Sequence, residues 1–335
     1  MEGIKITKQP RLKNPYLIVA WPGMGEVAFK AASFLVEKLG AVEFAEILPH
    51  DFFYLTAGVV NEGILTIPQM PSGKFYYYKT PAAKTGGPAK QPVGKTGNDL
   101  IIFVSNAQPD LAKAESYCER IISLAKLFKI KQVISFAAMP QAIDHTHIPA
   151  VWFASTSKEL SAELTKLNLN VLAQGQISGM NGLFLGVAKR AGLDGFCLLG
   201  EIPLYTIQIE NPKAAYVVLE ALNRILHIPI ELNGLLEQAQ TMEEEINKLL
   251  DYLKVSPAAE VPISEEDIEK IKKSLGQLTK LPISVKEKIE QLFTQSKTDI
   301  AKAQELKVEL DKWNVYKEYE DRFLDLFKKN NDTNN

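Results

Sequence analysis

The sequence is poor in the features that mark secreted and membrane proteins. It holds 2 cysteines among 335 residues, and no stretch of about 18 consecutive apolar residues occurs. Two cysteines are too few for the disulfide framework of a small secreted domain, and without a long apolar stretch no transmembrane helix is expected. The first residues also lack a charged-then-apolar signal pattern. We expect a soluble cytoplasmic protein that binds no membrane and keeps Cys118 and Cys197 as reduced core thiols.

An excess of charge of one sign is also missing. Lys and Arg total 38 and Asp and Glu total 40, which gives a net charge of −2. No global positive field attracts nucleic acid, so we expect no nucleic-acid partner. The chain is rich in apolar material, because 46% of its residues are hydrophobic. That suffices for one α/β domain of about 250 residues plus an appendage.

Three catalytic signatures are missing as well: a Gly-x-Ser-x-Gly nucleophile elbow, a complete phosphate loop and a cluster of metal ligands. His50 and Asp51 could serve a triad only with a nucleophile, which no elbow supplies. Asp144, His145 and His147 have a spacing that could bind zinc. No cysteine or third histidine lies near them, so a polar loop is the favoured interpretation. We expect no catalytic residues, no metal and no cofactor.

Short apolar segments alternate with helical repeats along most of the chain. This alternation predicts a three-layer α/β/α fold with a mainly parallel, mixed sheet and right-handed crossovers. A hairpin is expected within 58–70, around Asn61, Glu62 and Gly63, and makes the sheet mixed. Residues 80–97 are expected to be a mobile surface loop. The predicted strands are 16–21, 42–48, 75–78, 99–105, 131–139, 152–155 and 196–200, and the predicted helices are 27–39, 109–128, 157–167, 177–191 and 212–226.

Beyond about residue 235 the composition changes to glutamate, lysine and helically spaced apolar residues. We expect an α/β domain over 1–254 that ends in a helix over 235–253, a linker over 255–263, a helical extension over 264–330 and a disordered tail over 331–335. Ser264 and Asp267 resemble a capping box that opens a short helix. From Pro282 a last helix is expected, with an apolar stripe about 40 residues long, or roughly 60 Å. Such a stripe must fold back on shorter helices or pair with another chain. The candidates for a partner contact are Leu306, Leu310, Trp313 and Phe323.

A glycine-rich stretch, residues 174–203, contains seven glycines around a helix-length apolar repeat. It is typical of a strand-to-helix junction with close backbone packing. A second junction, Gly23, Met24 and Gly25, lies where a dinucleotide-binding fold has its phosphate-binding turn. The third glycine of that motif is missing and Glu26 adds negative charge, while Glu43 could contact a ribose by spacing alone. A tight turn is therefore favoured over a nucleotide site.

Polar side chains also follow several predicted strands. Asn106 and Gln108 end one strand, Asn181 lies near the start of a helix, and Glu201 ends another strand. Open α/β sheets bind ligands at the carboxyl ends of their strands, so these residues could line a crevice with Gly23, Met24 and Gly25. Glu201 could then act as an acid or a base. The favoured alternative is that all four side chains cap helices and turns.

Several segments in a fixed order resemble the proteasome-assembly-chaperone family, in its prokaryotic branch. They are 21–25, 176–183, 198–203 and 211–215, the last leading into 231–236, and the resemblance covers about residues 5–255. It implies a three-layer α/β/α fold related to those of purine nucleoside phosphorylases and peptidyl hydrolases. It also implies homotrimers or dimers and no established catalytic residues. Some members have been labelled ATP-grasp ligases, but no basic, glycine-rich phosphate loop occurs here.

The resemblance shapes the functional expectation. Some archaeal relatives end in a hydrophobic residue, tyrosine and any residue, which dock on a proteasome ring, whereas this chain ends Asn331-Asp-Thr-Asn-Asn335. The apolar-striped extension is therefore the expected interaction device. We expect a non-catalytic, assembly-chaperone-like protein whose partners are proteins and itself, with a homotrimer favoured. The alternative is an enzyme of the phosphorylase or ATP-dependent ligase type that binds a nucleoside, nucleotide or carboxylate.

Overall fold

A computed structural model of the chain describes residues 3–61, 63–81, 98–228, 230–255, 283–296, 301–312 and 315–328. The chain divides into two compact units, 1–240 and 241–335. The division falls inside the helix α6 (Asn233–Val255), ahead of the boundary expected at 254. Residues 82–97 of the loop expected over 80–97, residues 256–263 of the linker, the Ser264 capping box and the tail over 331–335 lie outside the described residues. The domain limits drawn from the sequence thus stay predictions.

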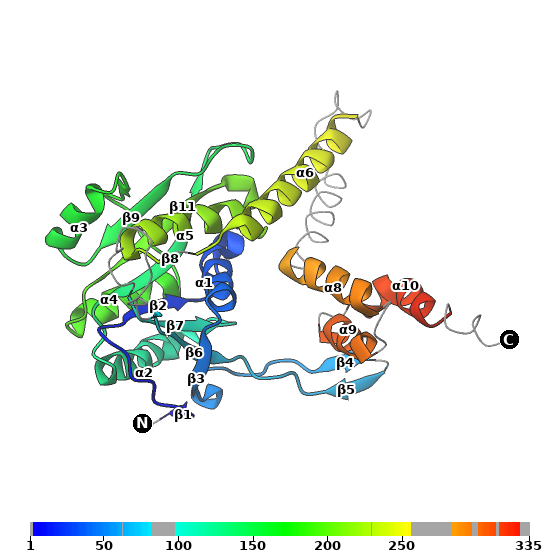
Figure 1. Cartoon of the computed structure of the whole chain (residues 1–335), viewed down its shortest axis with the longest axis horizontal. Coiled ribbons are helices and arrows are strands. Elements are labelled where there is room, and N and C mark those ends of the chain that lie inside the picture. Colours follow the sequence, from blue (N-terminus) through cyan, green and yellow to red (C-terminus); the bar gives the residue numbers. More distant parts are fainter. Residues whose placement is uncertain are drawn as a thin grey trace, which may run out of the picture. The chain divides into compact units, whose positions relative to one another are not determined.

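In its described residues, the first unit is built on a nine-stranded sheet with the order β1-β3-β6-β7-β2-β8-β11-β9-β10 (Figure 1). Its central strands are nearly continuous apolar runs, as expected for strands covered on both faces. The bounds are β1 Ile4–Ile6, β2 Tyr16–Ala20, β3 Val42–Ile47, β6 Gly73–Tyr78, β7 Leu100–Ser105, β8 Val133–Gln141, β9 Val151–Ser155, β10 Asn170–Val171 and β11 Gly195–Pro203.

The sheet is mixed, as predicted, but for a different reason. In the part of the chain that the structure describes, four of its eight pairings are parallel: β2 with β7, β2 with β8, β8 with β11, and β9 with β10. The other four, β1–β3, β3–β6, β6–β7 and β9–β11, are antiparallel. The predicted hairpin exists as β4 (Val59–Asn61) and β5 (Ile64–Thr66), yet it forms a two-stranded sheet of its own. The mixed character therefore does not come from the hairpin, and parallel pairing dominates only the centre of the sheet.

Helices cover both faces of the sheet, which confirms the three-layer fold (Figure 1). Side chains alternate along each strand, so Ile18 and Ile102 pack toward one layer of helices and Leu17 and Ile101 toward the other. The first layer contains α1 (Val27–Lys38), α3 (Lys158–Thr165) and α5 (Pro212–Leu226); the second contains α2 (Ala114–Leu127) and α4 (Met180–Arg190).

Local signals explain where these helices begin. Ser157 caps α3 by accepting a hydrogen bond from the Leu160 backbone N–H, as the sequence predicts. Asn211 caps α5 in the same way, and Pro212 stands at its first position. Helix α4 starts at Met180 rather than at 177. Gly179 has a φ of 73°, which is outside the range of an α-helix, so the helix does not extend to the residues before it.

Within the described residues beyond α6, three short helices stand in place of the single long one that the sequence predicts from Pro282. They are α8 (Ile283–Ser296), α9 (Ala301–Lys312) and α10 (Tyr316–Lys328). Ile289, Phe293, Leu306, Leu310 and Phe323 are buried together in one cluster that draws on all three. The apolar stripe is thus used to pack the helices on one another, which was one of the two alternatives for it. Trp313, the fourth candidate for a partner contact, lies outside the described residues.

Two glycines of α4 lie four residues apart in opposite environments. A Cβ atom at Gly182 would lie 2.0 Å from the carbonyl oxygen of Ile177, whereas a Cβ at Gly186 would meet no atom within 4 Å. Gly182 lets the loop before α4 pack against the helix backbone, and no such contact requires Gly186.

We predict that Gly182→Ala lowers the free energy of unfolding by at least about 2 kcal/mol, because a backbone atom must move. Gly186→Ala should raise it by about 0.5–1 kcal/mol through helix propensity. Urea denaturation followed by circular dichroism measures both. Equal effects of the two variants would contradict the close approach at Ile177.

Candidate functional site

A cavity of about 280 Å³ lies beside the carboxyl-terminal halves of the central strands. Gly23 and Met24, which follow β2, form part of its wall, together with residues 137–140 of β8 and Leu199 of β11. The rest comes from the loop over 172–178, from Asn181 at the start of α4, from Ala28 of α1 and from Gln108. None of the lining residues has an ionisable side chain. The position is the one where open α/β sheets bind ligands, but its lining is neutral.

The side-chain amide of Asn181 fixes one wall of this cavity. Its Oδ1 accepts a hydrogen bond from the Trp21 backbone N–H at 3.0 Å, and its Nδ2 donates to the Trp21 carbonyl oxygen at 3.1 Å. The amide thereby makes the two hydrogen bonds that a residue of a neighbouring strand would make, and it satisfies both backbone groups of Trp21. The pairing joins the first turn of α4 to the end of the central strand.

Gln108 makes a second bridge of the same kind. Its Nε2 donates to the Pro22 carbonyl oxygen at 2.8 Å, and its Oε1 accepts from the Met180 backbone N–H at 3.3 Å. A Cβ atom at Gly179 would lie 3.1 Å from this amide, so only a glycine leaves the bridge undisturbed. The structure thus brings together four of the seven predicted crevice residues: Gly23, Met24, Gln108 and Asn181.

The other three lie away from the cavity. Gly25 has a φ of 60° and exchanges backbone hydrogen bonds with Ile207 and Asn211, which anchor the start of α5. Asn106 pairs with the backbone of Ser72 at 2.8 and 3.1 Å and closes a turn beside β6. Both residues serve the turn and cap role that the sequence also suggested.

Glu201 is buried and holds two donors of the neighbouring strand. Its carboxylate accepts from the Ala150 backbone N–H at 2.9 Å and from Trp152 Nε1 at 2.8 Å. These bonds tie the end of β11 to the start of β9. The carboxylate is thereby occupied by structural contacts, in agreement with the favoured interpretation of this residue.

A charged group that the sequence did not single out lies beneath the turn at Gly25. Lys30 of α1 is buried and forms an ion pair with Glu210 at 2.5 Å. Glu26 stands next to this pair with a left-handed φ of 50°. Burial, and then the nearby Glu210 carboxylate, raise the pKa of Glu26 to about 7, while a hydrogen bond with the Gly23 backbone opposes the rise. The burial of Lys30 was not predicted, because nothing in the sequence around it distinguishes it from an exposed lysine of a helix.

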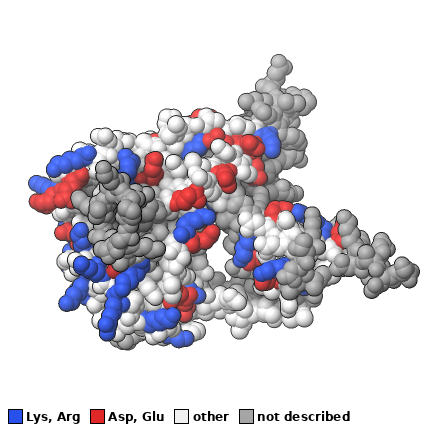
Figure 2. All heavy atoms as spheres, viewed as in Figure 1, with Lys and Arg blue, Asp and Glu red and all other residues white. Residues whose placement is uncertain are grey.

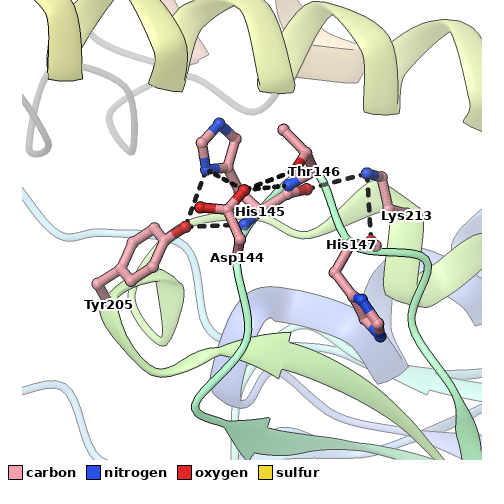
Figure 3. Close-up of polar contacts among 6 residues, drawn as sticks. All are labelled: Asp144, His145, Thr146, His147, Tyr205 and Lys213. Carbon is pink, nitrogen blue, oxygen red and sulfur yellow. Dashed lines mark hydrogen bonds and ion pairs between the residues drawn. The ribbon is translucent and has the colours of Figure 1, made fainter.

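The segment from Asp144 to His147 is a polar turn (Figure 3). Asp144 Oδ1 accepts from the backbone N–H and the hydroxyl of Thr146, which also lowers the pKa of this carboxyl group. The buried His145 contacts the Tyr205 hydroxyl through Nδ1 at 2.9 Å, and Lys213 donates to the His145 carbonyl oxygen at 2.9 Å. Figure 3 shows the imidazoles of His145 and His147 pointing in opposite directions. The two rings do not converge on a common point.

Other groups considered for chemistry have ordinary structural surroundings. Glu43 pairs with Lys74 at 3.0 Å on neighbouring strands, and His50 and Asp51 are exposed on a short 3₁₀ helix. Cys118 and Cys197 are unbonded and buried, and burial raises the pKa of each thiol to about 12. Across the described ranges, no three His, Cys, Asp or Glu side chains gather as metal ligands would. Over the same residues, no helix has the length and apolar character to span a bilayer.

The β4–β5 hairpin exposes an unusual amount of apolar surface. Seven large side chains between residues 54 and 67 are 40–83% exposed: Tyr54, Leu55, Val59, Val60, Ile64, Leu65 and Ile67. Residues 54–70 contain a single charged residue, Glu62. Elsewhere on the face shown in Figure 2, basic and acidic side chains are interspersed. We call residues 54–67 the apolar hairpin.

Comparison with known proteins identifies the family. The profile of the PAC2 family matches residues 17–250, which is more than half of the chain. The chain belongs to the PAC2 family. The predicted resemblance to proteasome assembly chaperones is confirmed.

Relatives of this PAC2 chain include two solved structures from Pyrococcus furiosus. PbaB, an archaeal proteasome activator, is 26% identical with a TM-score of 0.59, and the match covers 73% of this chain and 97% of PbaB. PbaA, an archaeal homologue of proteasome-assembly chaperone, is 25% identical with a TM-score of 0.55, over 83% and 99% of the two chains. Uncharacterized protein MJ1210 of Methanocaldococcus jannaschii is 29% identical over 267 residues, which are 78% of this chain and 93% of that protein.

The structural role of Glu201 can be tested by removing its carboxylate. We predict that Glu201→Ala lowers the free energy of unfolding by about 1–3 kcal/mol, because two donors lose their acceptor. In a double-mutant cycle with Trp152→Phe, the two changes should couple by about 1 kcal/mol. Stability within about 0.5 kcal/mol of the unmodified protein in urea denaturation would contradict this role.

The environment of Glu26 predicts a dependence of stability on pH. Its pKa is higher in the folded chain, about 7, than the ordinary 4.5, so the folded state binds the proton more tightly. Stability from this group is therefore greatest at low pH and falls as the pH rises from about 4.5 to 7.

Glu26→Gln removes this loss. Since Glu26 is partly exposed, we expect the variant to gain on the order of 1–2 kcal/mol relative to the unmodified protein between pH 5 and pH 8. Glu37→Gln, an exposed position on the same helix, is the matched control and should show no such gain. Urea denaturation at pH 5 and at pH 8 measures the free energy of unfolding of each protein. The same change between the two pH values in Glu26→Gln and in the unmodified protein would contradict the raised pKa of Glu26.

Proposed function

We propose that this chain is a non-catalytic, assembly-chaperone-like protein that acts by binding other proteins and further copies of itself. The observation that carries the proposal is the apolar hairpin, displayed by a member of a family with proteasome-associated relatives. Apolar patches of this kind mark sites of protein interaction.

The hairpin has the composition of an interface core. Its exposed side chains are apolar on both strands, and charged residues are depleted, as in the centres of protein interfaces. A two-stranded hairpin is marginally stable in water by itself, so covering its faces contributes to its own stability. Its two outer edges also offer unpaired backbone groups to another strand.

Self-association through this hairpin accounts for the expected homo-oligomer, with a trimer favoured. The edge strands of the main sheet are short, β1 with three residues and β10 with two, and short edges give little length for pairing. The hairpin is a better contact than the sheet edges because it is apolar and extends as a separate element.

The helical extension is the second proposed contact. Leu306, Leu310 and Phe323 hold its helices together, so the surface that it offers consists of other residues. Val308 and Leu324 are exposed on α9 and α10. We propose that this unit braces the oligomer or binds the partner, with the chain of 264–330 as the functional segment.

The named relatives indicate which partner to test first. PbaB is described as a proteasome activator and PbaA as a homologue of a proteasome-assembly chaperone. Both match this chain over nearly their full lengths, which supports a proteasome particle or its subunits as the partner class. The alternative of an enzyme has less support, since Glu201 is bound by Trp152 and Ala150 and does not line the cavity.

The apolar hairpin can be tested with two charged substitutions at its most exposed positions. Leu65→Asp combined with Ile67→Asp should reduce the oligomer to monomers and abolish capture of a proteasome core particle, because charge cannot be buried unpaired. Light scattering gives the mass, and pull-down with a purified core particle gives the binding. Circular dichroism checks that the fold is retained.

The matched control is Leu111→Asp, since Leu111 is 91% exposed on a different part of the first unit. It should leave mass and capture unchanged. If the hairpin variant keeps both the mass and the partner of the unmodified protein, the apolar hairpin is not the contact surface.

A further inference from the structure

The cavity beside β2, β8 and β11 has an apolar floor. Ala137, Ala138 and Met139 of β8 line it together with Leu172 and Ile177 of the loop before α4. A floor of this kind favours a flat, weakly hydrated group, and methionine sulfur makes favourable contacts with aromatic rings. The floor alone would accept any small apolar molecule.

The rim of the cavity adds polar groups that the fold itself does not use. Gln174, Gln176 and Ser178 line the cavity, and within the described residues their side chains have no hydrogen-bond partner. In contrast, the amides of Gln108 and Asn181 are bound to the backbone. A primary amide offers a donor next to an acceptor, and it pairs in a bidentate way with a ligand edge of the complementary pattern.

The neutral lining restricts the charge of the ligand. A phosphate or carboxylate moved out of water needs a cationic or strongly donating partner, and no Lys, Arg or His lines the cavity. A cationic ligand would equally need a carboxylate, and none lines it. The ligand that fits is uncharged.

Three glycines determine the backbone course of the loop that lines the cavity and of the start of α4. Gly182 allows Ile177 to pack against α4, and Gly175 and Gly179 have φ values of 150° and 73° that few other residues adopt. A preformed site loses little conformational entropy on binding. The cavity volume of about 280 Å³ lies just below the range of ligand pockets, which run from about 300 to 1,000 Å³.

We propose that this cavity binds a small uncharged molecule that combines a flat ring with an amide-type edge, as in a nucleobase or a nucleoside. The floor contacts the ring, and Gln174 and Gln176 pair with its donor and acceptor edge. The proposal goes beyond the interaction role and stands independently of it, because the cavity and the apolar hairpin share no residue.

Titration calorimetry on the full chain tests this with adenosine, inosine and uridine as probes. At least one of them should bind saturably at one site per chain, with a dissociation constant of about 1 mM or lower. The matching monophosphate should bind at least about tenfold more weakly, since no cation lines the site. Gln174→Leu combined with Gln176→Leu should weaken binding by about tenfold or more. Gln9→Leu, at an exposed position elsewhere, should leave it unchanged.

Three results would overturn the proposal. One is the absence of saturable binding of all three probes up to about 10 mM. Another is binding that the double glutamine variant leaves unchanged. The third is tighter binding of the monophosphate, of inorganic phosphate or of an apolar tripeptide than of any nucleoside. Since Leu65→Asp with Ile67→Asp should bind the nucleoside normally, failure here is distinguishable from failure of the hairpin contact.

Discussion

The double hydrogen bond between the Asn181 amide and the backbone of Trp21 is the interaction on which the centre of the structure depends. It satisfies both backbone groups of Trp21, the residue that follows β2, and holds the start of α4 beside them. Gln108 repeats the device one residue further along. Loss of the Asn181 amide would leave the buried backbone N–H and C=O of Trp21 without these partners.

Much of the fold was predictable because it follows from local patterns. The strands around Tyr16, Leu100 and Gly195 and the helix Pro212–Leu226 carry continuous apolar runs, caps and a first-turn proline that determine them. Which strands pair with one another depends less on local sequence. The hairpin has the same sequence pattern whether it joins the main sheet or forms a sheet of its own, so its separate sheet could not be predicted. The apolar stripe of the extension likewise fits one long helix or three short ones that pack together.

The candidate site was predictable in part for the same reason. Gly23, Met24 and Gln108 converge because the ends of parallel strands meet at one edge, and Asn181 at the start of α4 joins them by its hydrogen bonds to Trp21. Glu201 has the same kind of position, but its direction depends on Trp152 of a neighbouring antiparallel strand, which sequence spacing does not reveal. The ion pair of Lys30 and Glu210 joins residues 180 positions apart, so no local sequence pattern predicts it.

The central claim is that the apolar hairpin is covered by another protein chain, whether a second copy or a partner. Hydrogen–deuterium exchange measures this directly at the backbone amides of residues 54–67. The account predicts slow exchange of these amides at high protein concentration or with the partner bound, and fast exchange on dilution to monomers. Equally fast exchange under all conditions, with protection arising on another surface, would contradict it.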